Sequence, residues 1–224
     1  MHTYLAHHGV LGMKWGVWNN QTRARYEVSH TSKKLAESIS KVALTKEPKI
    51  TKDVTSAIKQ SGSDSYGLEH RLKTKESIQR KIDTDSEEKR ITTDDAAKGI
   101  KDAVRYTAVS NTNNFVNSYF KIKRELEKKG YSEVRCRNYF EMYLKGEVKH
   151  KSVQSVFEDK DGYLFEIQFQ TPESQQAKDL KTPIYEERRK PGLSSQRKKE
   201  LELQMTNLMD PVPIPEDIFK IKSH

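Results

Sequence analysis

The stretch from Tyr163 to Ser174 reads YLFEIQFQTPES, and its pattern indicates a β-strand that leads into a helix. Apolar side chains occupy alternate positions, as expected when one face of a strand lies against a core. The opposite face carries three polar side chains, Glu166, Gln168 and Gln170. This face either contacts solvent or lines a polar cleft, and the strand taken alone favours solvent. The following pair, Thr171 and Pro172, is typical of a helix start.

Strand and helix signals alternate around this stretch. The strand signals lie at 100–109, 132–140, 151–159 and 162–170. The last two strands are expected to pair as a hairpin around the turn Lys160-Asp161-Gly162. The helix signals lie at 74–84, 92–99, 113–130 and 171–190. Strands interspersed with helices predict an α+β fold, in which a mixed β-sheet is flanked by helices.

Composition divides the chain into four parts. Residues 1–20 are rich in Gly, His and Trp. Residues 21–67 are expected to form a basic helical segment that ends in a linker, QSGSDSYG. Residues 68–190 carry the strand and helix signals. Residues 191–224 are expected to form a helix, capped by Ser194 or Ser195, and a tail punctuated by Pro.

The chain has 224 residues and a formal net charge of +9. This charge favours a polyanionic partner, although ordinary lysine-rich helix surfaces explain it equally well. The single cysteine, Cys136, excludes an intramolecular disulfide. No apolar run approaches the ~18 residues of a membrane span, and the N-terminal residues lack the pattern of a signal peptide. Nothing in the sequence indicates the oligomeric state.

Basic residues and a hydroxyl follow one another in the segment HRLKTKESIQRKI. On a helix, Ser77 and Lys81 share a face and Lys73 lies one turn earlier. Such a row, with Arg71 at its entrance, fits the spaced oxygens of a triphosphate, although an ordinary basic helix face is the commoner explanation. Asp102 follows at the start of a predicted strand, where a carboxylate is either a magnesium ligand or a boundary residue.

Together these segments resemble the synthetase domain of RelA/SpoT-type alarmone synthetases, over about residues 68–190. The resemblance rests on the pattern Arg71-x-Lys73-x-x-x-Ser77-Ile78-x-Arg80-Lys81, then Ile100-x-Asp102, then Glu166-Ile167-Gln168-Phe169-x-Thr171. It implies a nucleotidyltransferase-like fold. It also implies an ATP-dependent pyrophosphokinase, which moves the β,γ-diphosphate of ATP to a ribose 3′-hydroxyl with the help of Mg²⁺.

The same resemblance implies roles for individual residues. Asp102 and Glu166 would be catalytic and would bind Mg²⁺, and Glu166 would help to deprotonate the 3′-hydroxyl. The residues implied to bind ATP are Arg71, Lys73, Ser77, Lys81 and Arg105. The residues implied to bind the acceptor are Lys145, His150, Ser152, Gln154 and Gln168.

The resemblance leaves the acceptor open. His150 stands where the family has a tyrosine that stacks on guanine, and Gln170 stands where it has an arginine. Basic residues at 145–151 form a loop that could meet a nucleotide or an RNA end. The candidate acceptors are therefore GDP, GTP, an adenine nucleotide and the 3′ end of tRNA.

The segment HHGVLGMKWGV, residues 7–17, resembles a short N-terminal element of proteins encoded near the head genes of tailed phages, often ahead of toxin-like domains. This resemblance implies a growth-inhibiting toxin of a phage or prophage, which acts in the bacterial cytoplasm or is associated with the virion. An antitoxin or immunity protein would then be a partner. Two alternatives are a catalytically idle, nucleic-acid-binding protein associated with the phage head, and a nuclease.

Overall fold

The computed structural model describes residues 20–189 and 192–224, with side chains from residue 28 onward. The chain divides into two compact units. The first comprises the described residues up to Ser40 and Thr74–Ile100, and the second comprises Lys41–Lys73 and Lys101–His224. The long helix α1, Asn20–Ser61, contributes to both units. The predicted phage-type motif at 7–17 lies outside the described residues.

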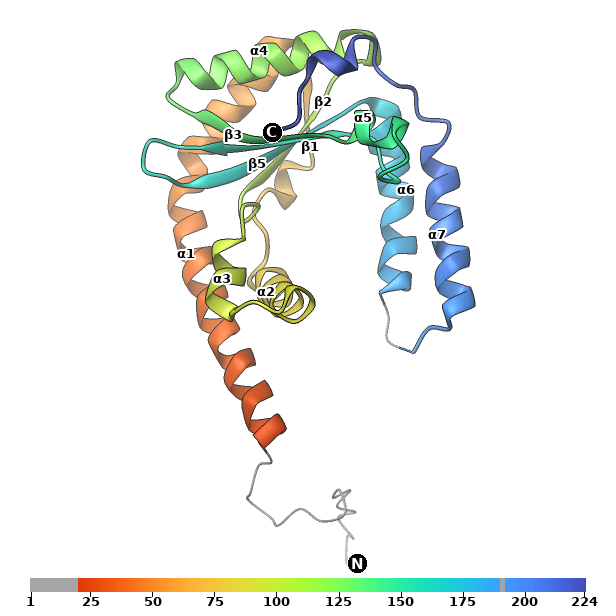
Figure 1. Ribbon diagram of the computed structural model, residues 1–224. Helices are drawn as coiled ribbons and strands as arrows, with labels where there is room; N and C mark the ends of the chain where they lie inside the picture. Colours follow the sequence, from red (N-terminus) through yellow and green to blue (C-terminus); the bar gives the residue numbers. More distant parts are fainter. Residues whose placement is uncertain (1–19, 190–191) are drawn as a thin grey trace, which may run out of the picture. The chain divides into compact units, whose positions relative to one another are not determined.

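A five-stranded mixed sheet forms the centre of the second unit (Figure 1). Its strands, in spatial order, are β1 (Asp64–Tyr66), β2 (Arg105–Val109), β5 (Leu164–Gln170), β4 (Val153–Glu158) and β3 (Ser132–Asn138). Strands β2 and β5 run parallel, and the other neighbouring pairs run antiparallel. The predicted α+β fold with a mixed sheet is therefore confirmed, and so is the hairpin of β4 and β5.

One face of this sheet forms the core of the second unit. The apolar side chains of β5 on this face are fully buried: Phe165, Ile167 and Phe169. Helix α4 (Phe115–Lys128) supplies Tyr119, whose ring packs edge-on against Phe169 with 4.9 Å between the centroids. Helix α1 supplies Thr51, whose hydroxyl lies 2.7 Å from that of Tyr106 on β2. The apolar face of YLFEIQFQTPES thus lies against helices, as its alternation predicts.

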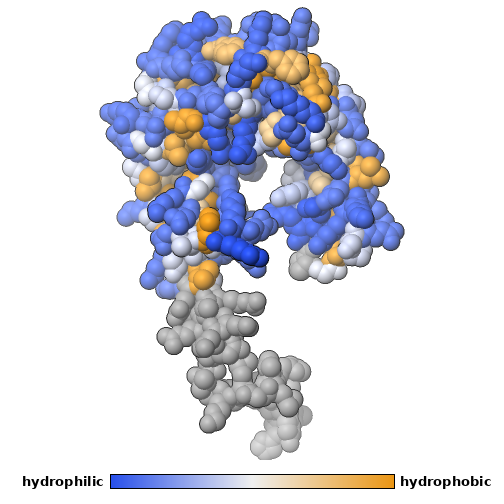
Figure 2. Space-filling view, in the orientation of Figure 1, coloured by the Kyte–Doolittle hydropathy of each residue, from blue (hydrophilic) through white to orange (hydrophobic). Residues whose placement is uncertain are grey.

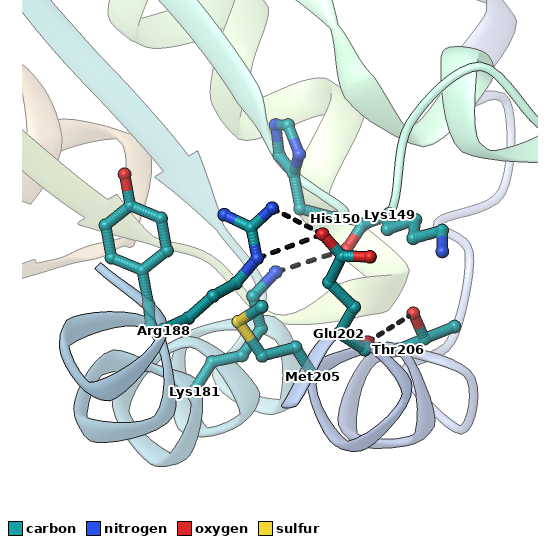
Figure 3. A pocket seen from close by; sticks show the side chains of 8 residues that line it. Lys149, His150, Lys181, Arg188, Glu202, Met205 and Thr206 are labelled. Atoms are coloured by element: carbon teal, nitrogen blue, oxygen red, sulfur yellow. Dashed lines mark hydrogen bonds and ion pairs between the residues drawn. The ribbon is translucent and has the colours of Figure 1, made fainter. Parts of the chain in front are cut away.

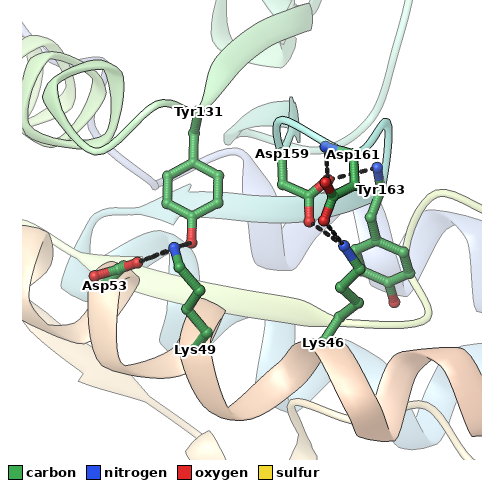
Figure 4. A network of polar contacts seen from close by, with 7 residues as sticks. All are labelled: Lys46, Lys49, Asp53, Tyr131, Asp159, Asp161 and Tyr163. Atoms are coloured by element: carbon green, nitrogen blue, oxygen red, sulfur yellow. Dashed lines mark hydrogen bonds and ion pairs between the residues drawn. The ribbon is translucent and has the colours of Figure 1, made fainter.

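Polar contacts fasten α1 to the hairpin of β4 and β5 and to Tyr131, just before β3 (Figure 4). The ammonium group of Lys46 lies 2.8 Å from Asp159 and 2.6 Å from Asp161, both in the hairpin turn. Lys49 donates a hydrogen bond of 3.0 Å to the Tyr131 hydroxyl. Ion pairs near the surface contribute only about 0–1 kcal/mol each. The position of α1 on the sheet therefore depends mainly on the apolar core.

Two antiparallel helices stand beside the opposite face of the sheet. Helix α6 (Pro172–Arg188) begins at the Thr171 cap, as predicted, and α7 (Ser195–Met209) begins at the Ser194 cap. The two helices are joined by ion pairs, of which Arg197 to Glu187 measures 2.8 Å. Because α6 follows β5 directly, its first turns lie next to the polar face of that strand.

The C-terminal tail covers the edge of the sheet. The backbone amide of Cys136 on β3 donates to the carbonyl of His224 at 3.1 Å, and the amide of His224 donates back at 2.9 Å. Just before β4, the short helix α5 (Tyr139–Leu144) is capped by Asn138, whose amide nitrogen also donates to the carbonyls of Ile218 and Ile221. The tail thereby occupies the backbone groups of Cys136, which would otherwise be open to pairing with another chain.

The first unit consists of the N-terminal part of α1 with α2 (Lys75–Lys89) and α3 (Thr93–Lys98). Thr74 caps α2 by accepting a hydrogen bond from the amide of Ser77. The buried residues of the two short helices are Ile78, Ile82, Ala96 and Ala97. The predicted helices at 74–84 and 92–99 are thus confirmed, with somewhat different ends.

Three segments differ from the sequence prediction. The segment at 60–67, which we expected to be a linker, contains β1, because its residues 64–66 pair with the edge of β2 despite their turn-like composition. The strand expected at 100–109 begins only at Arg105. The strand expected at 132–140 ends at Asn138, because the side chain of that residue caps α5.

Hydrophilic residues dominate the face of the molecule drawn in Figure 2, and hydrophobic residues are scattered among them. Exposed apolar side chains include Leu44, Leu180 and Leu203, which lie on different helices. Among the described residues, no helix combines the length and the apolar character needed to cross a bilayer.

Candidate active site

The polar face of β5 lies in a buried cleft, not in solvent. Glu166 and Gln168 are each 7% exposed, and Gln170 is 3% exposed. In the sheet register, Thr107 of β2 and Gln154 of β4 flank Gln168 on either side. The solvent-facing alternative favoured by the strand alone is therefore wrong. The reason is that α6 folds back beside this face, which a strand pattern cannot show.

A chain of hydrogen bonds holds the carboxylate of Glu166. The side-chain amide nitrogen of Gln168 donates to Glu166 Oε1 at 2.7 Å, and Lys178 of α6 donates to Gln168 Oε1 at 2.7 Å. The lysine thereby fixes the orientation of the amide, because an ammonium group can only donate. Burial and the nearby charge of Arg105 lower the pKa of Lys178 to about 8.

Asp102 lies on a chain segment next to that of Glu166. The backbone amide of Glu166 donates to the carbonyl of Val104 at 3.1 Å, two residues after Asp102. The carboxylate of Asp102 forms an ion pair with Lys73, and both side chains are largely buried. The proposed carboxylates and one proposed phosphate-binding cation thus occur together in the second unit.

The carboxylates at this site suit a cation that takes part of its ligands from a substrate. Within residues 28–189 and 192–224, no group of three or more His, Cys, Asp and Glu side chains could hold a metal. Mg²⁺ commonly binds through one or two carboxylates together with phosphate oxygens and water. Asp102 and Glu166 fit that requirement in number and in chemistry.

The remaining residues predicted to bind ATP lie in different surroundings. In the second unit, Arg71 donates to the buried carboxylate of Glu47, and Arg105 lies beside Glu166 in the sheet register. In the first unit, Ser77 and Lys81 lie on α2, as the helical spacing predicted.

In the loop that precedes β4, some of the predicted acceptor residues are exposed and others are buried. Lys145 is exposed and lies 2.7 Å from Glu141, whereas the ring of His150 packs on Tyr139 with 4.0 Å between centroids. Ser152 is 1% exposed, and among the described residues its hydroxyl has no hydrogen-bond partner. Lys151 of the predicted basic loop is buried, so its charge is not part of the surface of that loop.

Two pockets lie where this loop meets α6, both within the second unit. The larger, about 350 Å³, lies between α6, α7 and the loop (Figure 3). The smaller, about 190 Å³, reaches from the loop to Gln154 and Gln168 on the sheet. His150 and Lys181 line both pockets. The predicted acceptor residues His150, Ser152, Gln154 and Gln168 are thus brought together around the smaller pocket.

His150 is expected to remain neutral to unusually low pH. Burial, with the charge of Lys181 as a second cause, lowers its pKa from 6.5 to about 4. As the pH falls, the imidazole of His150 is therefore protonated in the unfolded chain before it is protonated in the folded one. The contribution of this group to the free energy of unfolding is complete above pH 6.5 and is lost as the pH drops toward 4. An NMR titration should place the midpoint of the His150 signal near pH 4. The signal is identified by its loss in His150→Gln, and a midpoint near 6.5 would contradict the prediction.

Sequence reasoning missed two lysines of α6, Lys178 and Lys181. A signal for them exists in the helix itself, because Ser174, Lys178 and Lys181 follow the spacing i, i+4 and i+7 of one helix face. The hydroxyl of Ser174 donates to Gln170 on the polar face of β5 at 2.6 Å. The two lysines lie on the same face of α6 as Ser174, within the next two turns of the helix, so the sequence places them on the side of α6 that faces the sheet.

No protein-family model and no curated protein matches the sequence. Among solved structures, the fold is similar to that of small alarmone synthetase 1 from Bacillus subtilis, with 16% identity, a TM-score of 0.47, and coverage of 84% of this chain and 91% of that one. A GTP pyrophosphokinase family protein from Streptococcus pneumoniae is 15% identical with a TM-score of 0.46, and the match covers 85% of this chain and 89% of that one. A chain in the complex of the Type VI effector Tas1 with its immunity protein is 15% identical with a TM-score of 0.46, and the match covers 77% of this chain and 93% of that one.

Proposed function

We propose that this protein transfers the β,γ-diphosphate of ATP to the 3′-hydroxyl of a nucleotide or of tRNA. The observation that carries the proposal is the buried polar cleft. In it, Glu166 is held by Gln168, and the neighbouring chain segment carries the ion pair of Asp102 with Lys73. Transfer of phosphoryl groups depends chiefly on positioning and on neutralising charge, which such a cleft provides.

In the proposed reaction, the acceptor 3′-oxygen forms a bond to the β-phosphorus, the bond from that phosphorus to the α,β-bridging oxygen breaks, and AMP leaves. Glu166 accepts the proton of the 3′-hydroxyl. Lys73 and Arg71 neutralise phosphate charge. Asp102 and Glu166 would hold Mg²⁺, which supplies further neutralisation of the phosphate oxygens.

Incubation of the full chain with Mg²⁺ and γ-labelled ATP tests this proposal. Guanine nucleotides, adenine nucleotides and tRNA are offered in separate reactions. We expect label to appear on one acceptor class, with one AMP released for each diphosphate transferred. The proposal fails if no acceptor gains label under conditions where the protein is folded and binds ATP.

We further propose that the activity arrests growth of the bacterial cell in which the protein is made, as a toxin of phage or prophage origin with a neutralising partner. This rests on the sequence motif at 7–17 and on the proposed reaction. Induced expression of the wild type should stop growth, whereas a catalytically inactive variant at equal level should not.

One feature favours a second candidate, a nucleic-acid-binding protein without catalysis. A cavity of about 860 Å³ runs along β3, and its lining holds two carboxylates, Glu141 and Glu147, and five cations: Lys101, Arg135, Arg137, Lys145 and Lys222. Cations along a groove are typical of contacts with phosphate backbones. Salt-dependent DNA binding that persists in Asp102→Ala, together with no diphosphate transfer, would favour this candidate.

A further inference from the structure

The smaller pocket, which we call the lysine pocket, has a one-sided charge. Lys151, Lys178 and Lys181 line it together with Met209 and neutral polar residues, and no lining residue is acidic. Burying ammonium groups is unfavourable unless a counter-charge or strong acceptors compensate them. The question is therefore what compensates each of the three lysines.

Lys151 is compensated within the protein. Its ammonium group donates to the carbonyls of Asp210 at 3.0 Å and Val212 at 2.7 Å, and it lies 4.2 Å from the centre of the Tyr143 ring. This lysine therefore attaches the loop to the segment after α7 and leaves no charge for the pocket.

Lys178 and Lys181 are not compensated in this way. Each is half-buried and donates one hydrogen bond, Lys178 to the neutral amide of Gln168 at 2.7 Å and Lys181 to the carbonyl of Lys149 at 3.2 Å. Among the described residues, neither lysine forms an ion pair. Burial lowers the pKa of both groups; for Lys178 the nearby charge of Arg105 adds to this effect, and the charges of Asp179 and Glu166 oppose it.

A second feature of the lysine pocket is the hydroxyl of Ser152. This residue is 1% exposed, yet its hydroxyl has no hydrogen-bond partner in the described part of the chain. Buried polar atoms without partners are rare in proteins, and one that lines a pocket indicates a missing acceptor. Two cations without an ion pair in the described part of the chain and one unused hydroxyl therefore belong to the lining of the same small pocket.

We propose that Lys178, Lys181 and the Ser152 hydroxyl form an anion site that holds a phosphate group of the acceptor. The assignment to the acceptor rests on the proposed function, whereas the anion site rests on the pocket itself. A phosphate oxygen accepts from ammonium and hydroxyl donors alike, and its charge offsets both lysines. The rest of the acceptor would extend into the larger pocket, which shares His150 and Lys181 with this one.

NMR of the full-length protein labelled at the lysine ε-carbons tests the anion site with inorganic phosphate and pyrophosphate, without ATP or Mg²⁺. The two signals are identified by their loss in Lys178→Met and in Lys181→Met. We expect both signals to shift and to saturate as the anion is added. The pKa of Lys178 should rise from about 8 when the anion is bound, and affinity should fall as the pH rises above this value.

Replacing one lysine by Met should weaken binding about tenfold, and replacing both about a hundredfold. Lys121→Met removes the same charge from an exposed site on α4 and should leave the affinity unchanged. Because the Met variants lose a half-buried ammonium that forms no ion pair among the described residues, they should unfold at the wild-type temperature or above it.

Unchanged phosphate affinity in the folded double variant would overturn the anion site. Lysine signals that shift with guanosine or adenosine but not with phosphate would also overturn it, since the pocket would then bind a base.

Steady-state kinetics separates this proposal from the proposed function. Lys181→Met leaves the contact of Lys178 with Gln168 in place, so it should raise KM for the acceptor about tenfold with little change in kcat. If the wild type transfers diphosphate and KM is unchanged in this variant, the assignment to the acceptor fails while the function stands. If phosphate binding depends on the lysines but no acceptor gains diphosphate, the function fails while the anion site stands.

Discussion

Glu166→Gln is expected to abolish diphosphate transfer, with a loss in kcat of about 10²–10³-fold or more. The amide cannot accept the proton of the 3′-hydroxyl, and it offers no negative charge to a divalent cation. It keeps the size of the side chain and can still form a hydrogen bond with Gln168, so the fold should remain. Initial rates at saturating ATP measure the loss of catalysis, and thermal unfolding of the same samples measures any loss of stability.

A matched control uses the same chemical change at a position outside the cleft. Glu127 is exposed on α4, so Glu127→Gln should transfer diphosphate at the wild-type rate. A rate for Glu166→Gln close to that of this control would refute the role of the carboxylate. It would leave the cleft as a structural feature and would favour the nucleic-acid-binding candidate.

The sheet and its core could be predicted because their signals are local. Alternation over 163–170 identifies both faces of β5, and the turn at Lys160-Asp161-Gly162 fixes the hairpin with β4. The fold class follows from the order of strands and helices alone. The candidate carboxylates Asp102 and Glu166 also came from the sequence, through a pattern spread over three segments.

The surroundings of those carboxylates could not be predicted, because they depend on contacts between distant segments. Whether the polar face of β5 is solvated depends on where α6 turns after Thr171, and no property of the strand decides that. The same folding brings Lys178 to Gln168. Lys151 cannot be distinguished from Lys149 in the sequence, yet it is buried, and its ammonium group donates hydrogen bonds to backbone carbonyls that follow α7.

Phe165→Ala is expected to lower the free energy of unfolding by about 3–5 kcal/mol. Phe165 is 0% exposed, and its ring meets three others: edge-on with Tyr106 at 6.3 Å and Tyr131 at 5.4 Å, and stacked with Phe157 at 5.8 Å. Removing the ring leaves a cavity between the sheet and its helices that rigid neighbours cannot fill. Denaturant titration of the wild type and the variant measures the difference.

Leu180→Ala is the control for this prediction, because Leu180 is 54% exposed on α6 and its truncation should cost no more than about 0.5 kcal/mol. A loss below about 1 kcal/mol for Phe165→Ala would show that the aromatic cluster is loosely packed. The comparison also bears on the cleft, since Phe165 and Glu166 are consecutive and point to opposite faces of β5. If the core holds Glu166 in place, the folded fraction of Phe165→Ala should transfer diphosphate more slowly, whereas Leu180→Ala should not.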